Sequence, residues 1–91
     1  MSLEHKVALV TGAGSGVGRA SVLALLKKGY KVVLAGRRQE VLEETISLSN
    51  GAKEQTLVVP TDITIPDAVK GLFEQISKIY GRLHVLFNNA G

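Results

Sequence analysis

The stretch from residue 10 to residue 18, VTGAGSGVG, has four glycines in seven positions and directly follows an apolar run. Without a Cβ atom, a glycine backbone lets peptide N–H groups come close to a ligand. A helix that begins at such a loop adds unpaired N–H groups and the positive end of its dipole, and both favour a phosphate. The stretch therefore predicts a phosphate-binding loop, although a purely structural turn would have the same composition.

The spacing of these glycines narrows the kind of phosphate site. The pattern G-x-G-x-x-G is absent, because the sixth position from either starting glycine is not a glycine. A Walker A loop is excluded, because Arg19-Ala20 stands where G-K-[ST] is required. The pattern that fits is G-x-x-x-G-x-G. In it Gly12 would make the tight turn out of the strand, Gly16 would let the backbone approach a pyrophosphate, and Gly18 would let the helix pack closely.

The elements around the loop follow from hydropathy patterning. Short apolar runs, typical of strands buried on both faces, alternate with helical patterns. The predicted strands are Lys6–Thr11, Lys31–Ala35, Gln55–Pro60 and His84–Asn88, and the predicted helices run from the loop to Gly29, from Gln39 to about Leu48, and from Pro66 to Gly81. At about 30 residues per βαβ unit, this alternation predicts a parallel sheet with helices on both faces. We expect one α/β domain over residues 1–91, the N-terminal half of a Rossmann-like doubly wound sheet with strand order 3-2-1-4.

In each predicted helix, a set of residues recurs at helical spacing and so lies on one side of the helix. In the first helix the recurring residues are Val17, Ala20, Ser21, Ala24, Leu25 and Lys28. In the second they are Val41, Leu42, Thr45 and Ile46. The inward side of the third helix is predicted to consist of Val69, Leu72, Phe73, Ile76 and Ile79.

Four motifs in order resemble those of one family. The segment Thr11–Gly18 resembles the T-G-x-x-x-G-x-G cofactor loop of the classical short-chain dehydrogenases/reductases. Gly36-Arg37-Arg38 follows the second predicted strand, Asp62-Ile63 follows the third, and Asn88-Asn89-Ala90-Gly91 ends the fourth and matches the family's N-N-A-G motif. Because these motifs span nearly the whole chain, the chain is identified as similar to the cofactor-binding part of that family.

The resemblance implies a dinucleotide site and a set of residues that bind it. These are Gly12, Ser15, Gly16, Val17, Gly18, Arg37, Arg38, Asp62, Ile63, Asn89, Ala90 and Gly91. By the same resemblance, Ser15 would donate to a phosphate or the ribose, Asn89-Ala90-Gly91 would line the adenosine ribose, and Asn88 would tie neighbouring sheet backbones together. The implied reaction is hydride transfer between NADPH and a carbonyl or alcohol carbon of a small molecule, in a protein that forms homo-oligomers when complete.

The residues after the second predicted strand bear on cofactor preference. A free ribose 2′-hydroxyl is usually held by a carboxylate there, and NAD-preferring members of the family have Asp where this chain has Gly36. A guanidinium suits a 2′-phosphate, so Arg37 is predicted to bind it and Arg38 to supply a second contact. NADP(H) is therefore the expected cofactor, with NAD(H) still possible. The alternative is a solvated pair at a helix start, although cations there oppose the dipole.

Two roles are possible for Asp62. It could cap the turn before the third helix, a common role for Asp. The resemblance implies instead that its carboxylate accepts a hydrogen bond from the adenine amino group, with the backbone of Ile63 beside it.

The family's catalytic Tyr-x-x-x-Lys is absent from these 91 residues, because Leu34 and His84 stand four positions after Tyr30 and Tyr80. We therefore predict no catalytic residue here and expect the chain to be the cofactor half of a longer enzyme. The alternative is a free-standing half-domain that binds a nucleotide or a partner without catalysis. A methyltransferase is disfavoured, because those proteins usually have an acidic residue where Gly36 stands.

Composition excludes several other classes. The chain has no cysteine, so disulfides and thiolate chemistry are excluded, and its two histidines lack metal-ligand spacing. The net charge of +3 comes from scattered residues, and with two tyrosines, two phenylalanines and no tryptophan there is no nucleic-acid surface. The N-terminal apolar run is too short for a signal peptide or a membrane span, so a cytoplasmic protein is expected.

Overall fold

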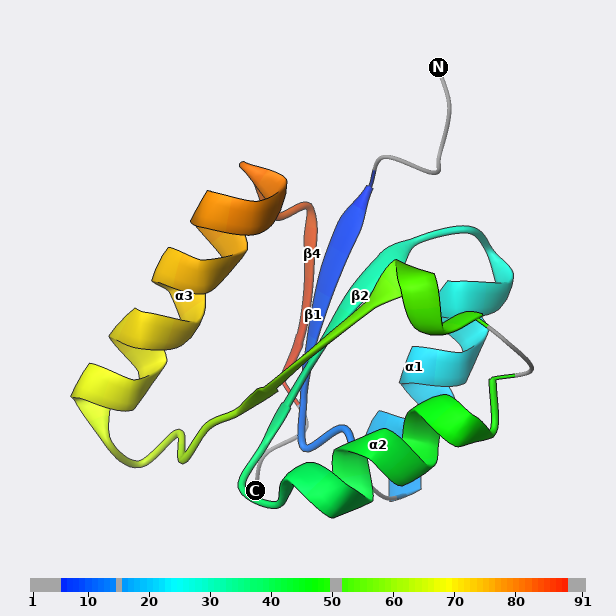
Figure 1. Cartoon of the computed structure of the whole chain (residues 1–91), viewed down its shortest axis with the longest axis horizontal. Helices are drawn as coiled ribbons and strands as arrows, with labels where there is room; N and C mark the ends of the chain where they lie inside the picture. Colours follow the sequence, from blue (N-terminus) through cyan, green and yellow to red (C-terminus); the bar gives the residue numbers. More distant parts are fainter. Residues whose placement is uncertain (1–5, 15, 50–51, 89–91) are drawn as a thin grey trace.

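The computed structural model describes residues 6–14, 16–49 and 52–88. Four parallel strands form one sheet in the order β3-β2-β1-β4, which confirms the predicted order (Figure 1). The strands are β1 (Val7–Thr11), β2 (Lys31–Gly36), β3 (Thr56–Pro60) and β4 (Val85–Asn88). The helices are α1 (Gly16–Lys27), α2 (Gln39–Ser47) and α3 (Pro66–Tyr80), with a short 3-10 helix, η2 (Ala52–Gln55), before β3.

The two central strands are buried on both faces, as their continuous apolar runs predict. Figure 1 shows α1 and α2 on one side of the sheet and α3 on the other. Alternate residues of β1 and β2 therefore enter two separate cores. The core under α1 and α2 includes Ala8, Val10, Val32, Leu34, Val22, Leu25, Leu26 and Leu42, and the core under α3 includes Val7, Leu9, Val33, Ala35, Val59, Leu72 and Ile76.

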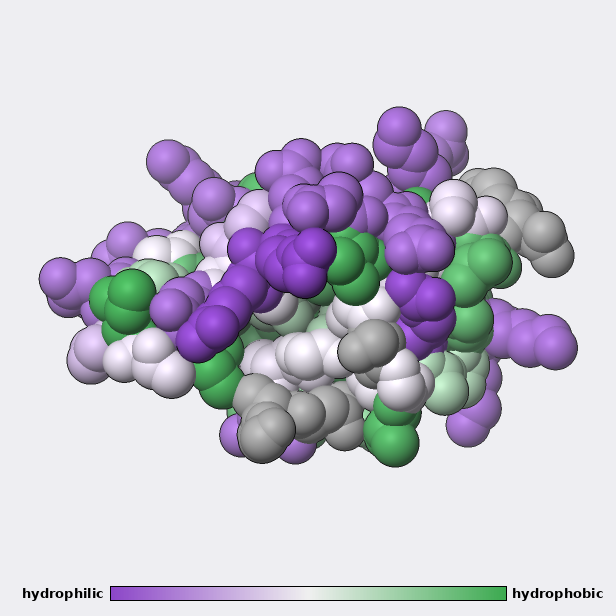
Figure 2. Space-filling view, turned by 90° about the horizontal axis from the view of Figure 1, so that it is seen from below, coloured by the Kyte–Doolittle hydropathy of each residue, from purple (hydrophilic) through white to green (hydrophobic). Residues whose placement is uncertain are grey.

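The register of the sheet brings the four sequence motifs to one edge. Thr11 is paired with Ala35 on one side and with Asn88 on the other, and Gly36 is paired with Pro60. The carboxyl ends of all four strands therefore lie side by side, where ligands bind in open α/β sheets. Figure 2 looks onto this edge and shows a pale centre of intermediate hydropathy beside a purple, hydrophilic flank.

The buried side of α1 differs from the repeat seen in the sequence. It consists of Gly18, Val22, Leu25 and Leu26, and Val17 is 71% exposed. The reason is Gly18, where an added Cβ would collide with the carbonyl oxygen of Gly12. That close approach sets the rotation of the helix, and the positions four, seven and eight residues later then face the sheet.

Helix α3 ends as predicted, but its buried side is narrower than expected. Pro66 stands at its start, and Gly81 caps it with a left-handed φ of 84°. Leu72 and Ile76 are buried, whereas Phe73 and Ile79 are 41% and 52% exposed, so the prediction that those two face inward was wrong. One stripe of a helix contacts the sheet, and residues at the margins of that stripe remain in solvent.

Each of the four strands differs from its predicted range by one residue. Strand β1 begins one residue later, at Val7, and β2 extends one residue further, to Gly36. Gln55 belongs to η2, so β3 begins one residue later than predicted. His84 precedes β4, where its Nδ1 accepts a hydrogen bond of 3.0 Å from the Val7 N–H. No helix in the described part of the chain is long and apolar enough to cross a membrane.

Candidate dinucleotide site

The glycine loop between β1 and α1 has the backbone geometry that its sequence predicts. Gly12 and Gly16 have φ angles of 61° and 58°, in the left-handed region that favours glycine. A Cβ on Gly16 would meet nothing within 4 Å, so the space in front of this residue is open. Gly18 instead lies against the Gly12 backbone. Each of the three motif glycines thus has its own physical reason to lack a side chain. Ser15 lies outside the described residues.

The start of α1 supplies the electrostatics of the candidate site. Helix α1 has 12 residues and no acidic residue in its first turn. The first N–H groups of a helix have no partner within the helix, and its dipole makes this end partly positive. Val17 lies in this first turn with its side chain exposed. The arrangement suits an anion, and the nearby loop leaves room for one.

A cavity of about 280 Å³ joins this loop to the residues after β2. It is lined by Gly12, Gly14, Gly36, Arg37, Arg38, Val41 and Leu42. The structure thus brings the loop glycines to the two arginines predicted to bind a 2′-phosphate. Phosphate and guanidinium interact by charge-assisted hydrogen bonds, so a ligand with phosphates at both ends of this cavity fits its chemistry.

Both arginines are exposed and each pairs with one carboxylate. Arg37 Nε lies 3.7 Å from Asp62 Oδ2, and the Arg37 side chain is 69% exposed. Arg38 Nε lies 3.6 Å from Glu40 Oε2 in the first turn of α2. Exposed pairs of this kind contribute little to stability. They therefore leave the guanidinium groups able to exchange a carboxylate for a phosphate.

Asp62 makes the hydrogen bonds expected of a residue that caps the turn before α3, the first of its two predicted roles. Its Oδ1 accepts hydrogen bonds from the N–H of Thr64 at 3.0 Å and from the Thr64 hydroxyl at 2.6 Å. These bonds, with a smaller contribution from the charge of Arg37, hold the pKa of Asp62 below its ordinary value. The cap uses Oδ1, and Oδ2 faces Arg37, so the predicted adenine contact stays a prediction.

Ile63 and Asn88 lie near the end of β4. Ile63 is 40% exposed and borders a cavity of about 240 Å³ with Phe73, Leu86 and others. The Thr11 hydroxyl donates a 3.0 Å hydrogen bond to Asn88 Oδ1, which links β1 to β4 through side chains. Asn89, Ala90 and Gly91 lie outside the described residues.

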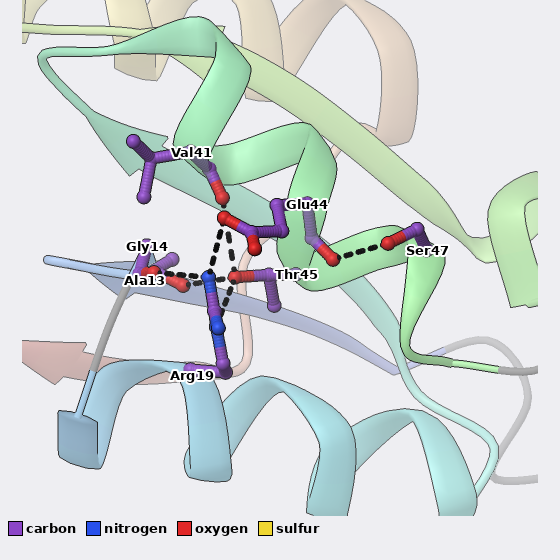
Figure 3. Close-up of polar contacts among 7 residues, drawn as sticks. All are labelled: Ala13, Gly14, Arg19, Val41, Glu44, Thr45 and Ser47. Carbon is purple, nitrogen blue, oxygen red and sulfur yellow. Dashed lines mark hydrogen bonds and ion pairs between the residues drawn. The ribbon is translucent and has the colours of Figure 1, made fainter.

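Three residues near the loop were missed by the sequence analysis as parts of the site. A Cβ on Gly14 would lie 2.5 Å from Val41 Cγ1, so this glycine lets the loop touch α2. Arg19 and Thr45 form hydrogen bonds between α1, α2 and the loop (Figure 3). A polar Thr45 among the apolar residues on one side of α2 was the available signal.

The described part of the site holds no tyrosine. Tyr30 directly precedes β2, and Tyr80 ends α3 beside Val7 and His84, so both lie at the amino ends of the strands. Burial raises the pKa of Tyr80. At the carboxyl edge the described residues instead offer a helix start, loop glycines and two arginines, a combination that suits phosphate groups. No three described His, Asp or Glu side chains are grouped to hold a metal ion.

The fold is of the Rossmann class, in which the first turn between strand and helix is the usual phosphate site. A family model described as short chain dehydrogenase matches residues 6–91. The chain belongs to the short-chain dehydrogenase family.

Relatives and solved structures agree with this family. The chain is 38% identical to the uncharacterized oxidoreductase Lmo0432 of Listeria monocytogenes, over 100% of this chain and 37% of that protein. A short chain dehydrogenase from Bacillus anthracis superposes with a TM-score of 0.92 at 34% identity, covering 100% of this chain and 37% of that one. The chain thus spans little more than a third of the length of the proteins it matches.

Two further structures were solved with cofactors. A variant of actinorhodin polyketide ketoreductase with NADPH superposes with a TM-score of 0.88 at 33% identity, over 100% of this chain and 35% of that one. NAD⁺-bound xylitol dehydrogenase superposes with a TM-score of 0.90 at 32% identity, with the same coverage. Proteins similar to this chain therefore include both NADPH-bound and NAD⁺-bound structures.

Proposed function

We propose that residues 1–91 are the cofactor-binding half of a short-chain dehydrogenase/reductase that transfers hydride between NADP(H) and a carbonyl or alcohol carbon of a small molecule. The observation that carries this proposal is the cavity of about 280 Å³, which joins the glycine loop to Arg37 and Arg38 at the carboxyl ends of the strands. In parallel α/β sheets this is the place for a dinucleotide.

The pyrophosphate would lie against the start of α1. The open space in front of Gly16 admits it, and the left-handed φ of Gly12 and Gly16 turns the backbone there without a Cβ penalty. The helix dipole and its unpaired N–H groups stabilise the negative charge. Ser15 and Val17 complete the proposed contacts of the loop.

The adenosine would lie between the ends of β2 and β3. Arg37 would bind the 2′-phosphate and Arg38 would add a second charge, and no carboxylate stands at Gly36 to hold a ribose hydroxyl. Asp62 and Ile63 would border the adenine, and Asn89, Ala90 and Gly91 the ribose. This arrangement favours NADP(H) over NAD(H).

The nicotinamide supplies or accepts the hydride when the cofactor is bound. The residues named above would bind and orient the cofactor, while the acid and base that act on the substrate would come from other parts of the enzyme. A second candidate is a nucleotide-binding module without catalysis, which also agrees with the position of Tyr30 and Tyr80 at the amino ends of the strands.

Calorimetric titration of the full-length natural polypeptide with NADP⁺ and NAD⁺ tests the proposal. We expect both to bind and NADP⁺ to bind at least tenfold more tightly, since a charge-assisted hydrogen bond contributes about 1.5–3 kcal/mol. Binding of neither would reject the function, and equal affinities would reject the preference. NADPH oxidation with a panel of aldehydes and ketones then separates the enzyme from the module, because only the enzyme turns over.

A further inference from the structure

Arg19 connects three parts of the molecule near the loop (Figure 3). Its Nη2 donates a 2.7 Å hydrogen bond to the carbonyl oxygen of Gly14. Its Nε donates a 3.0 Å hydrogen bond to the hydroxyl of Thr45 in α2, and Nη2 also lies 3.4 Å from Glu44 Oε1. The Arg19 side chain is only 26% exposed, so these bonds are partly shielded from water. Arg19 thus holds the loop and α2 from its place in the first turn of α1.

Thr45 extends this connection to the preceding residue of the loop. Its side chain is fully buried, and its hydroxyl accepts from Arg19 while lying 3.0 Å from the carbonyl oxygen of Ala13, to which it donates. The other acceptor within reach, the Val41 carbonyl of the same helix, is farther away at 3.4 Å. Two successive carbonyl groups of the loop, those of Ala13 and Gly14, are therefore held by side chains of α2 and α1.

These bonds restrict the shape of the loop. Because the peptide unit is planar and trans, a carbonyl of Ala13 directed at Thr45 turns the N–H of Gly14 to the opposite side. Gly14 also contacts α2 directly, since a Cβ there would lie 2.5 Å from Val41 Cγ1. The side of the loop that faces α2 is thus taken up by carbonyl groups and packing.

The same contacts connect the glycine loop to the part of the candidate site formed by α2 and the residues that precede it. Val41 and Leu42 of α2 line the cavity together with Arg37 and Arg38, and the loop glycines line its other side. A positively charged side chain in the first turn of a helix opposes the helix dipole. Arg19 stands in that position, and its bonds to Gly14, Thr45 and Glu44 offset the cost.

We propose that Arg19 and Thr45 are positioning residues that hold the glycine loop on α2 in the shape that receives the phosphates of a dinucleotide. This inference rests on the proposed function, and it assigns to the pair no contact with the cofactor itself. Arg19 acts through the Gly14 carbonyl, and Thr45 acts through the Ala13 carbonyl and by orienting Arg19.

The test measures ligand affinity in the full-length natural polypeptide and its variants, with the melting temperature recorded for each. Arg19→Met keeps the apolar stem and removes the bonds, and Thr45→Val removes only the buried hydroxyl. Thr45→Ser restores that hydroxyl. Glu43→Gln is the matched control, because Glu43 is an exposed residue of the same helix that pairs with Gln39 instead. The ligands are NADP⁺, NAD⁺ and adenosine 2′-monophosphate, which lacks the pyrophosphate.

We expect Arg19→Met and Thr45→Val each to weaken NADP⁺ and NAD⁺ by a similar factor, about tenfold for the loss of a bond to a charged group. Adenosine 2′-monophosphate should bind as it does to the wild type, and Thr45→Ser and Glu43→Gln should bind dinucleotides normally. The double variant should bind no more weakly than the worse single variant, because both residues hold the same loop.

Other outcomes overturn the inference. Normal dinucleotide affinity in Arg19→Met, or effects that add in the double variant, would show that the pair does not act as a unit. If Arg19→Lys binds normally while Arg19→Met does not, the charge alone matters, because lysine lacks the rigid fork that serves two partners. Arg19 is partly exposed, so we expect its variants to fold. If Thr45→Val fails to fold, the Arg19 variants still test the inference. Absence of binding by the wild type would instead reject the proposed function.

Discussion

Arg37 Nε and Asp62 Oδ2 lie 3.7 Å apart, which pairs the residue that follows β2 with a residue that follows β3. The two are 25 residues apart in the sequence, and the parallel register of Gly36 with Pro60 makes them neighbours. Arg37 is mostly exposed, so this contact contributes little to stability. The contact shows that the guanidinium can reach the edge of the sheet where the adenosine is proposed to bind.

Replacement of Arg37 tests its role in cofactor preference. Arg37→Ala should weaken NADP(H) at least tenfold and leave NAD(H) nearly unchanged, because a lost charge-assisted bond costs about 1.5–3 kcal/mol. Arg82→Ala is the control, since Arg82 is exposed near the amino ends of the strands. Dissociation constants from calorimetry give the comparison. Equal loss of both cofactors would remove Arg37 from this role.

Gly36→Asp should shift the preference toward NAD(H), because the new carboxylate accepts from the ribose hydroxyls and repels the 2′-phosphate. A Cβ at this position would lie 3.1 Å from Leu42 Cδ2, so the Leu42 side chain must shift slightly. Gly36→Asn introduces the same crowding without the charge. Both variants should lose similar stability, and only Gly36→Asp should reject NADP(H). A matching rejection by Gly36→Asn would point to crowding instead.

Gly16→Val should abolish dinucleotide binding while the fold survives. Its methyl groups would fill the open space proposed for the pyrophosphate, and the left-handed φ of 58° adds about 1–2 kcal/mol of backbone strain. Gly29→Val is the control, because Gly29 also has a left-handed φ, of 93°, and open space around it but lies after α1, away from the candidate site. Thermal unfolding and calorimetry on both variants check this. Normal binding by Gly16→Val would make the loop a turn and nothing more.

Asp62 should make stability depend on pH in the acid range. Its pKa in the folded protein is lowered from 3.8, first by the hydrogen bonds from Thr64. The stabilisation is therefore fully present above the ordinary pKa and is lost as the pH falls through the lowered one. Asp62→Asn removes this titration, so its melting temperature should fall less than that of the wild type on acidification below 3.8. Parallel curves for the two proteins would contradict the assignment.

A polypeptide of residues 1–91 alone should self-associate and should not oxidise NADPH with carbonyl substrates. Strand β4 pairs only with β1 among the described strands, and Leu86 and Phe87 are 52% and 38% exposed. An apolar strand edge is a template for association. Leu86→Lys should reduce the association, and Leu48→Lys, with the same 52% exposure on α2's end, should not. Gel filtration of a dilute sample measures the association, and an NADPH-oxidation assay measures the turnover. A monomer that turns over carbonyl substrates would contradict both expectations.

Local sequence was enough to predict the elements, their order and several backbone conformations. The tight turn at Gly12, the end of α3 at Gly81 and the buried strands β1 and β2 follow from residue type and hydropathy period. The strand order follows from the doubly wound pattern, in which the chain crosses back after the third strand and the fourth pairs with the first. The arrangement of the motifs at one edge follows in turn, because parallel strands end on the same side.

Tertiary contacts decided what these patterns leave open. The rotation of α1 depends on the contact of Gly18 with Gly12, and the exposure of Phe73 and Ile79 depends on which stripe of α3 meets the sheet. Arg19 and Thr45 are 26 residues apart, and nothing in the spacing of either predicts a bond between them. Hydropathy periods describe each element by itself, whereas such contacts depend on the rotation and separation of two packed elements, which only the folded chain determines.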